Sequence, residues 1–320
     1  MPGDSPNWGS GRHLAVRPFE LRPRPPFRLD LTVWALRRRE QNRIDNWDGR
    51  SYRRALLVDD SPLELAVTQV GPANTPRLQV VLSGPHVTGS AEAAARSTLA
   101  RLLGLDLDLS GFYARAARDS ALNELAELYR GVKPPRFPTI FECLLNAVAC
   151  QQFSLEAGLT LLSRLAASAG ARAGALHTFP APADVLSLPR PALRKLGFSE
   201  RKAETILELA RAAAAGELEL QAFEQLDDAA VVQALVQRRG IGRWSADYVL
   251  LRGLGRLHVF PQSDVGALNG LRSYLAVTGR DDDYRAALAR WAPDAGLAYF
   301  HLLLRGLERE GTPEPFFNTS

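Results

Sequence analysis

Cysteine, lysine and long apolar runs are all scarce in this chain of 320 residues. Its two cysteines, Cys143 and Cys150, are too few for a four-cysteine iron-sulfur or zinc site. They lie seven positions apart in an apolar helical stretch, about two turns, which is too far for a disulfide within one helix. We therefore expect two reduced core residues. The five histidines follow no metal-ligand spacing, so we expect no metal site.

The chain also lacks any apolar run near the roughly 18 residues that a membrane-spanning helix needs. Its N-terminus has no apolar core of a secretion signal. With 46% hydrophobic and 23% charged residues, the chain has the composition of a globular protein with a sizeable core. We expect a cytoplasmic protein with no membrane partner, associated with the bacterial nucleoid.

The chain contains three lysines and 36 arginines, and its formal net charge is only +4. A codon bias toward arginine explains most of this imbalance. The guanidinium fork nevertheless suits phosphate groups better than an ammonium does, because it is planar and donates two hydrogen bonds side by side. With a sequence pI near 9.3, the composition is compatible with a nucleic-acid partner.

The pattern along the chain predicts an α+β fold in three parts. Residues 1–26 are rich in Pro, Gly and Arg and predict a disordered basic arm. Residues 27–112 predict a small domain with an antiparallel sheet, followed by an amphipathic helix over Ala91–Leu103. The β-prone runs of that domain are Ser51–Val58, Leu63–Val70 and Arg77–Gly84.

Helical periodicity dominates residues 113–320 and predicts a two-lobed, all-helical core. Within it, residues 227–254 predict two helices joined by the tight turn "RRGIG", which ends at Gly242. Gly240 and Gly242 permit backbone angles that a side chain forbids, and they let another molecule approach closely. Backbone N–H groups of the turn and of the next helix could then converge on a phosphate. The simpler alternative is a glycine at an ordinary helix corner.

The string "LVQRRGIGRWSADY", followed by "VFPQSDVG", resembles the helix-hairpin-helix DNA glycosylases, and within them the 3-methyladenine DNA glycosylase II type. The segments "ACQQFS" and "LRKLGFSERKAETILELA" are similar to the same family, and the resemblance covers about residues 27 to 307. It implies a monofunctional enzyme that flips alkylated bases, such as 3-methyladenine and 7-methylguanine, out of double-stranded DNA and hydrolyses their bond to the sugar. It also implies a monomer without a required cofactor, with room for a monovalent cation held by backbone carbonyls of the hairpin.

The resemblance assigns the catalytic role to Asp264, twenty residues after Trp244. Loss of a base leaves positive charge on the sugar, which a carboxylate beside that carbon stabilises while it orients the attacking water. Asp264 also follows Ser263 at an expected helix start, so a plain N-cap is the alternative.

Trp244 occupies the hairpin position at which strand-cutting relatives carry a lysine nucleophile, so the resemblance implies that water is the nucleophile here. Tyr248 lies one helical turn beyond, so the two rings share a face on which a flipped, cationic base could stack. Trp34 and Trp291 are further base-pocket candidates. The alternative for Trp244 is burial as core filler.

Contacts to DNA are expected from the hairpin and from the end of the helix before "QQFS". Gln152 matches the position of the family's wedge, which fills the space left by the flipped base; the alternative is a polar helix end that faces solvent. The expected DNA-binding residues are Gly240, Gly242, Arg238, Arg239, Arg243, Ser245, Gln151 and Gln152.

One segment departs from the family pattern. Relatives often carry Pro-Trp-Arg-Ser or Pro-Tyr-Arg-Ser before the last helix, whereas this chain has Pro293, Asp294, Ala295 and Gly296. The departure predicts a more open or more polar base pocket. Two other functions stay open: a non-catalytic helix-hairpin-helix DNA-binding protein, and a glycosylase for oxidised or deaminated bases.

Overall fold

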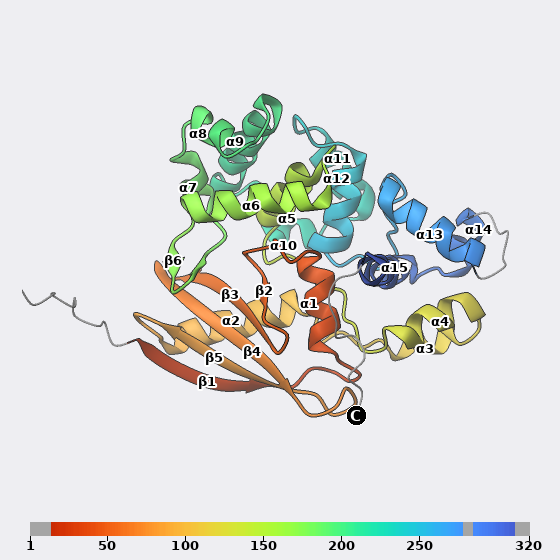
Figure 1. The fold of residues 1–320 in the computed structure, drawn as a ribbon. Coiled ribbons are helices and arrows are strands. Elements are labelled where there is room, and N and C mark those ends of the chain that lie inside the picture. Colours follow the sequence, from red (N-terminus) through yellow and green to blue (C-terminus); the bar gives the residue numbers. More distant parts are fainter. Residues whose placement is uncertain (1–13, 278–283, 311–320) are drawn as a thin grey trace, which may run out of the picture.

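A computed structural model describes residues 14–277 and 284–310 and places a five-stranded antiparallel sheet beside a larger helical region (Figure 1). The strand order is β1-β5-β4-β3-β2. Leu63, Leu65 and Val67 alternate toward one buried face of β4, as expected where one side of a sheet meets a core. Two helices, α1 and α2, pack their apolar residues on that face. The element bounds are β1 Ala15–Leu21, α1 Leu29–Arg37, β2 Asn46–Trp47, β3 Ser51–Val58, β4 Ser61–Val70, β5 Arg77–Gly84 and α2 Gly89–Leu102.

The predicted disordered arm is wrong for its second half. Ala15–Leu21 is strand β1, which pairs along its whole length with β5 at the edge of the sheet. Most of its side chains are exposed, so it carries no alternating pattern, and Pro18 is tolerated because an edge strand needs only one bonded side. Residues 1–13 lie outside the described residues.

The helical region forms two lobes, which confirms the predicted α+β architecture (Figure 1). The first lobe is built around α5 and α9 and contains the hairpin, and the second is built around α15. The helices are α3 Ser110–Ala116, α4 Ser120–Leu128, α5 Ile140–Cys150, α6 Leu155–Ala169, α7 Pro182–Leu186, α8 Arg190–Lys195, α9 Glu200–Ala214, α10 Leu220–Glu224, α11 Asp228–Val236, α12 Arg243–Tyr248, α13 Val265–Val277, α14 Tyr284–Arg290 and α15 Ala295–Arg309. A π-helical turn, η1 Val249–Gly253, extends α12, and the short strands β6 Arg172–Ala173 and β7 Leu176–His177 form a hairpin.

The predicted domain boundary between residues 112 and 113 is misplaced, because it falls inside α3. Leu105 still belongs to the core of the sheet domain, whereas Leu109 already belongs to the core of the second lobe. The change from one core to the next therefore comes a few residues earlier than the helical periodicity indicated.

Buried polar residues join the sheet domain to the first lobe. Arg54 of β3 donates to Asp45 at 2.7 Å and to both carboxylate oxygens of Glu142 on α5, at 2.6 and 2.7 Å. Tyr52 donates its hydroxyl to the same Asp45 at 2.7 Å. All four side chains are buried, so the positive charge of Arg54 is balanced by two carboxylates at this junction. In the part of the chain that the structure describes, no helix has both the length and the apolar character to cross a membrane.

Candidate active site

Two adjoining hollows open between the lobes and share the side chains of Trp244 and Asp264. The first, here the aromatic cavity, has a volume of about 380 Å³. Its principal lining residues are Arg38, Phe153, Trp244, Tyr248, Phe260, Asp264 and Tyr299. The second, here the hairpin groove, has a volume of about 630 Å³. Its principal lining residues are Gln151, Gln152, Lys202, Thr205, Gly240, Gly242, Trp244, Ser245 and Asp264.

The two hairpin glycines lie in different structural environments. Gly240 has φ +82°, and a Cβ there would lie 2.2 Å from the Thr205 hydroxyl oxygen, so packing against α9 requires glycine. Gly242 begins α12 with an extended backbone, and a Cβ there would meet nothing within 4 Å. The first N–H groups of a helix have no partner within it, and Gly242 has no side chain to cap them. Open space and free donors at this helix start suit an anion.

Gln151 and Ser245 hold the hairpin in place. The Gln151 amide donates to the Gly240 carbonyl at 3.0 Å and to the Ser245 hydroxyl at 2.9 Å. Ser245 is only 1% exposed and its hydroxyl already accepts from Gln151, so its contact with DNA stays a prediction that would involve its backbone N–H. The monovalent cation stays a prediction. The Gly240 carbonyl oxygen already accepts a hydrogen bond from Gln151, so it would bind a cation through its second lone pair. Gln152, by contrast, is exposed on a left-handed backbone with φ +54°, and its wedge role stays a prediction.

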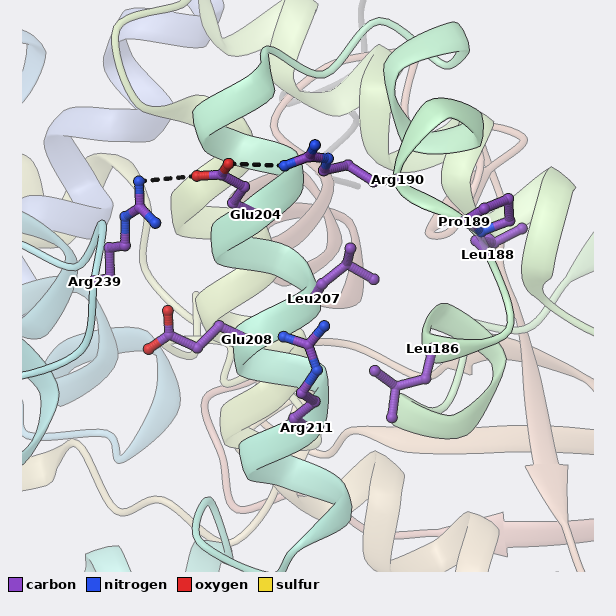
Figure 2. Close-up of a pocket in the computed structure, with 9 residues that line it drawn as sticks. All are labelled: Leu186, Leu188, Pro189, Arg190, Glu204, Leu207, Glu208, Arg211 and Arg239. Carbon is purple, nitrogen blue, oxygen red and sulfur yellow. Dashed lines mark hydrogen bonds and ion pairs between the residues drawn. The ribbon is translucent and has the colours of Figure 1, made fainter.

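The three predicted arginines lie around the hairpin but not in the lining of the groove. Arg238 is largely covered and pairs with Glu217 at 3.1 Å. Arg243 is well exposed and pairs with Asp247 in its own helix at 2.8 Å. Arg239 extends into a separate surface hollow beside α9, where Figure 2 shows it joined to Glu204, at 2.9 Å. Glu204 also pairs with Arg190 there, so the Glu204 carboxylate neutralises part of the positive charge of the two arginines.

Asp264 performs two structural tasks at the boundary between the hollows. Its Oδ1 accepts a hydrogen bond from the Ala267 backbone N–H at 2.9 Å, which caps the start of α13. Its Oδ2 accepts one from the Trp244 indole at 3.2 Å. The predicted N-cap is therefore real, and the same carboxylate still lines both hollows. These two bonds fix the orientation of the carboxylate.

Trp244 and Tyr248 form the predicted ring pair, with centroids 5.5 Å apart and planes tilted by 30°. Trp244 is partly exposed, whereas Tyr248 is buried and donates its hydroxyl to Asn146 at 3.0 Å. Burial raises the pKa of the Tyr248 phenol, so this ring stays neutral at physiological pH. Both rings line the aromatic cavity.

The other two predicted pocket tryptophans are misassigned. Trp34 and Trp291 are buried in the core of the second lobe, and neither lines the aromatic cavity. Two rings that were not predicted from the sequence, Phe260 and Tyr299, line the cavity with centroids 6.2 Å apart. Phe260 lies inside the motif "VFPQSDVG", four residues before Asp264, and could have been found there. Tyr299 carries no comparable signal.

The segment that departs from the family pattern does not line the aromatic cavity, and the expected more open or more polar pocket stays a prediction. Asp294 is buried and receives two hydrogen bonds from Arg115, at 2.6 and 2.8 Å. A Cβ on Gly296 would lie 2.7 Å from the carbonyl oxygens of Leu257 and Val259, so close backbone packing requires this glycine. Charged side chains of the cavity lining are Asp264, Arg38, and Arg39 with its ion-pair partner Glu310.

No group of three metal-ligating side chains occurs within residues 14–277 and 284–310. The two cysteines are free, Cys143 buried and Cys150 partly exposed.

Part of the chain, which includes this site, is similar to known proteins. Residues 145–293 match the model of the HhH-GPD superfamily base excision DNA repair protein. A putative DNA-3-methyladenine glycosylase of Bacillus subtilis is 28% identical over 57% of this chain, and the match spans 64% of that relative's length, slightly under two thirds. DNA-3-methyladenine glycosylase 2 of Escherichia coli is 26% identical over 77% of this chain and 84% of its own length.

The solved structure of a 3-methyladenine DNA-glycosylase from Archaeoglobus fulgidus has the same fold, with a TM-score of 0.75 at 24% identity. The alignment covers 89% of this chain and 97% of that one. The matched region holds the hairpin, the ring pair and Asp264. The part of the chain that is similar to the HhH-GPD superfamily of base excision DNA repair proteins thus contains the candidate active site.

Proposed function

We propose that this protein is a monofunctional DNA glycosylase, which flips a damaged base from duplex DNA into the aromatic cavity and hydrolyses its bond to deoxyribose. The single observation that carries the proposal is the position of Asp264. Its carboxylate lies where an aromatic cavity meets a groove with an open helix start, and the Trp244 indole fixes its orientation at 3.2 Å.

The two hollows suit the two parts of such a substrate. Aromatic faces in the cavity offer stacking surfaces for a base that has left the helix. The groove offers the uncapped start of α12 at Gly242, where N–H groups and the helix dipole favour a phosphate. Arg239 and Arg243 lie exposed beside it and would add affinity for the DNA backbone that does not depend on sequence. All of these residues belong to one chain, so the proposal needs only a monomer.

Asp264 would act while the glycosidic bond breaks. Positive charge develops on the sugar, and the carboxylate stabilises it from the mouth of the cavity. The same carboxylate orients and accepts a proton from the water that attacks this carbon. Alkylated bases such as 3-methyladenine and 7-methylguanine leave readily because they carry positive charge, so modest catalytic help removes them ahead of normal bases.

The groove contains one lysine among the described residues that line it, Lys202. Its ammonium donates to the Ala149 carbonyl at 2.9 Å and lies 3.7 Å from the centre of the Phe153 ring. Burial lowers its pKa. Because these contacts hold the ammonium at the end of α5, the proposal gives it no covalent role, and water remains the nucleophile.

The test uses a duplex with one 7-methylguanine. The expected product is an abasic site, so strand cleavage appears only after alkali treatment, and sodium borohydride traps no covalent complex. A strand break without alkali, or a trapped complex that Lys202→Gln abolishes, would show a lyase instead. Binding without any excision would leave a non-catalytic DNA-binding protein.

A further inference from the structure

Arg38 places a positive charge in the wall of the aromatic cavity. It ends α1 in a left-handed conformation, with φ 62°, and is only 4% exposed. One Nη donates to the Asn146 side-chain oxygen at 2.5 Å, and Nε is buried without a hydrogen-bond partner. The guanidinium is thus anchored at one end and keeps donor capacity.

No carboxylate of the described residues pairs with Arg38 within 4 Å. The carboxylate of the nearby Asp45 already accepts hydrogen bonds from Arg54 and Tyr52. Burial alone would lower the pKa of Arg38, but nearby groups, among them the Asp45 carboxylate, raise it. The guanidinium therefore stays charged, and its partner Asn146 is neutral.

This charge acts on any base in the cavity, because Arg38 lines the cavity together with the rings of Tyr248 and Tyr299. A cationic base that lacks a carbonyl, such as 3-methyladenine, meets a like charge there. A neutral 6-oxopurine offers its carbonyl oxygen as an acceptor for a charge-assisted hydrogen bond. Such a base must also leave with its bonding electrons, and a guanidinium donor stabilises the negative charge that forms on it.

We propose that Arg38 is a specificity residue that favours neutral purines with a carbonyl group, represented by hypoxanthine, over cationic purines without one. This inference rests on the proposed glycosylase function and concerns the same cavity. Selection against normal guanine would come from the flipping step, since a deaminated base opposite thymine is mispaired and costs less to extrude.

The test measures single-turnover excision of hypoxanthine from a duplex with one hypoxanthine·thymine pair, and of 3-methyladenine from methylated duplex. Arg38→Met removes the charge and keeps much of the side-chain volume. We expect the ratio of the hypoxanthine rate to the 3-methyladenine rate to fall by about tenfold or more, the effect of losing a hydrogen bond to a charged group. Arg53→Met, an exposed arginine on β3, is the matched control and should keep the wild-type ratio.

Asn146→Asp keeps Arg38 and supplies the missing carboxylate, so it should shift the ratio in the same direction by pairing the guanidinium. This second variant decides the matter if Arg38→Met proves unfolded. A wild-type ratio in a folded Arg38→Met, or in Asn146→Asp when Arg38→Met does not fold, would overturn the inference and leave the glycosylase proposal standing. If the wild-type protein excises neither base, the result would instead contradict the proposed glycosylase function.

Discussion

Two arginines of the N-terminal part of the chain contact α5 one helical turn apart and are neutralised to different degrees. Arg54 meets Glu142 and Asp45, so two carboxylates surround it. Arg38 donates to the neutral amide of Asn146 beside the aromatic cavity, and no carboxylate of the described residues pairs with it. A buried cation without a carboxylate is costly. The first arrangement joins two parts of the molecule, and the second leaves charge available to a ligand.

The largest effect should come from breaking the balanced junction. Replacing Glu142 by Leu leaves Arg54 with a single carboxylate in a buried place, and we expect a loss of about 3–5 kcal/mol in the free energy of unfolding. Urea unfolding measures this. Glu64→Gln, which removes the partly buried carboxylate that pairs with the exposed Arg53, should cost less than about 1 kcal/mol. Equal losses in the two variants would contradict the distinction.

His301 on α15 supplies a third case, a buried basic group that stays neutral. It is fully buried beside the Phe112 and Tyr129 rings, and burial lowers its pKa to about 4 from an ordinary 6.5. Between those values only the unfolded chain takes up the proton, so stability should fall as pH drops from 6.5 to 4, by about 3 kcal/mol in total. His301→Leu should remove this part of the pH dependence. Parallel stability curves for the two proteins between pH 7 and 4 would count against it.

Asn146→Leu should have a somewhat smaller effect on stability. It removes the acceptor shared by Arg38 and Tyr248 and leaves two donors to find other partners. We expect a loss of about 2–3 kcal/mol, because one of the donors is charged. Thermal and urea unfolding both report it, and a loss as large as that of Glu142→Leu would mean that Arg38 depends on its amide as strongly as Arg54 depends on its carboxylates.

Tyr248→Phe should have the smallest effect in this series. It deletes one neutral hydrogen bond to Asn146 at 3.0 Å and keeps the stacking ring, so the expected loss is about 1 kcal/mol. The ratio of hypoxanthine to 3-methyladenine excision should not change. A changed ratio would assign base selection to the phenol as well as to Arg38.

Elements with strong local signals could be predicted from the sequence. The strands Ser51–Val58 and Arg77–Gly84 have their predicted bounds, because β-prone residues are bounded there by turns. The side chains of Ser154 and Asp227 cap helices through contacts with residues three positions later, which is the kind of local signal that a sequence carries. Strand β1 was missed because an exposed edge strand needs no apolar pattern, and its pairing with β5 depends on residues about sixty positions away.

The site was predictable only where a motif carries it. Asp264, Trp244 and Tyr248 lie in or beside the hairpin string, and the structure brings them together. Trp34 and Trp291 were misassigned because a tryptophan suits a core as well as a pocket, and the sequence does not say which face meets which lobe. Arg38 could not be found, since its role depends on a left-handed helix end and on Asn146, 108 residues later.

The central claim is that Asp264 is the catalytic carboxylate, and single-turnover excision of 7-methylguanine by Asp264→Asn tests it most directly. The asparagine keeps one acceptor oxygen, which can still cap α13, and loses only the bond from the Trp244 indole, so folding and duplex affinity should remain. Asp227→Asn is the matched control, because Asp227 caps α11 in the same manner without lining either hollow. The account predicts an excision rate lower by orders of magnitude in Asp264→Asn alone, with DNA binding retained. An unchanged excision rate in that variant would contradict it.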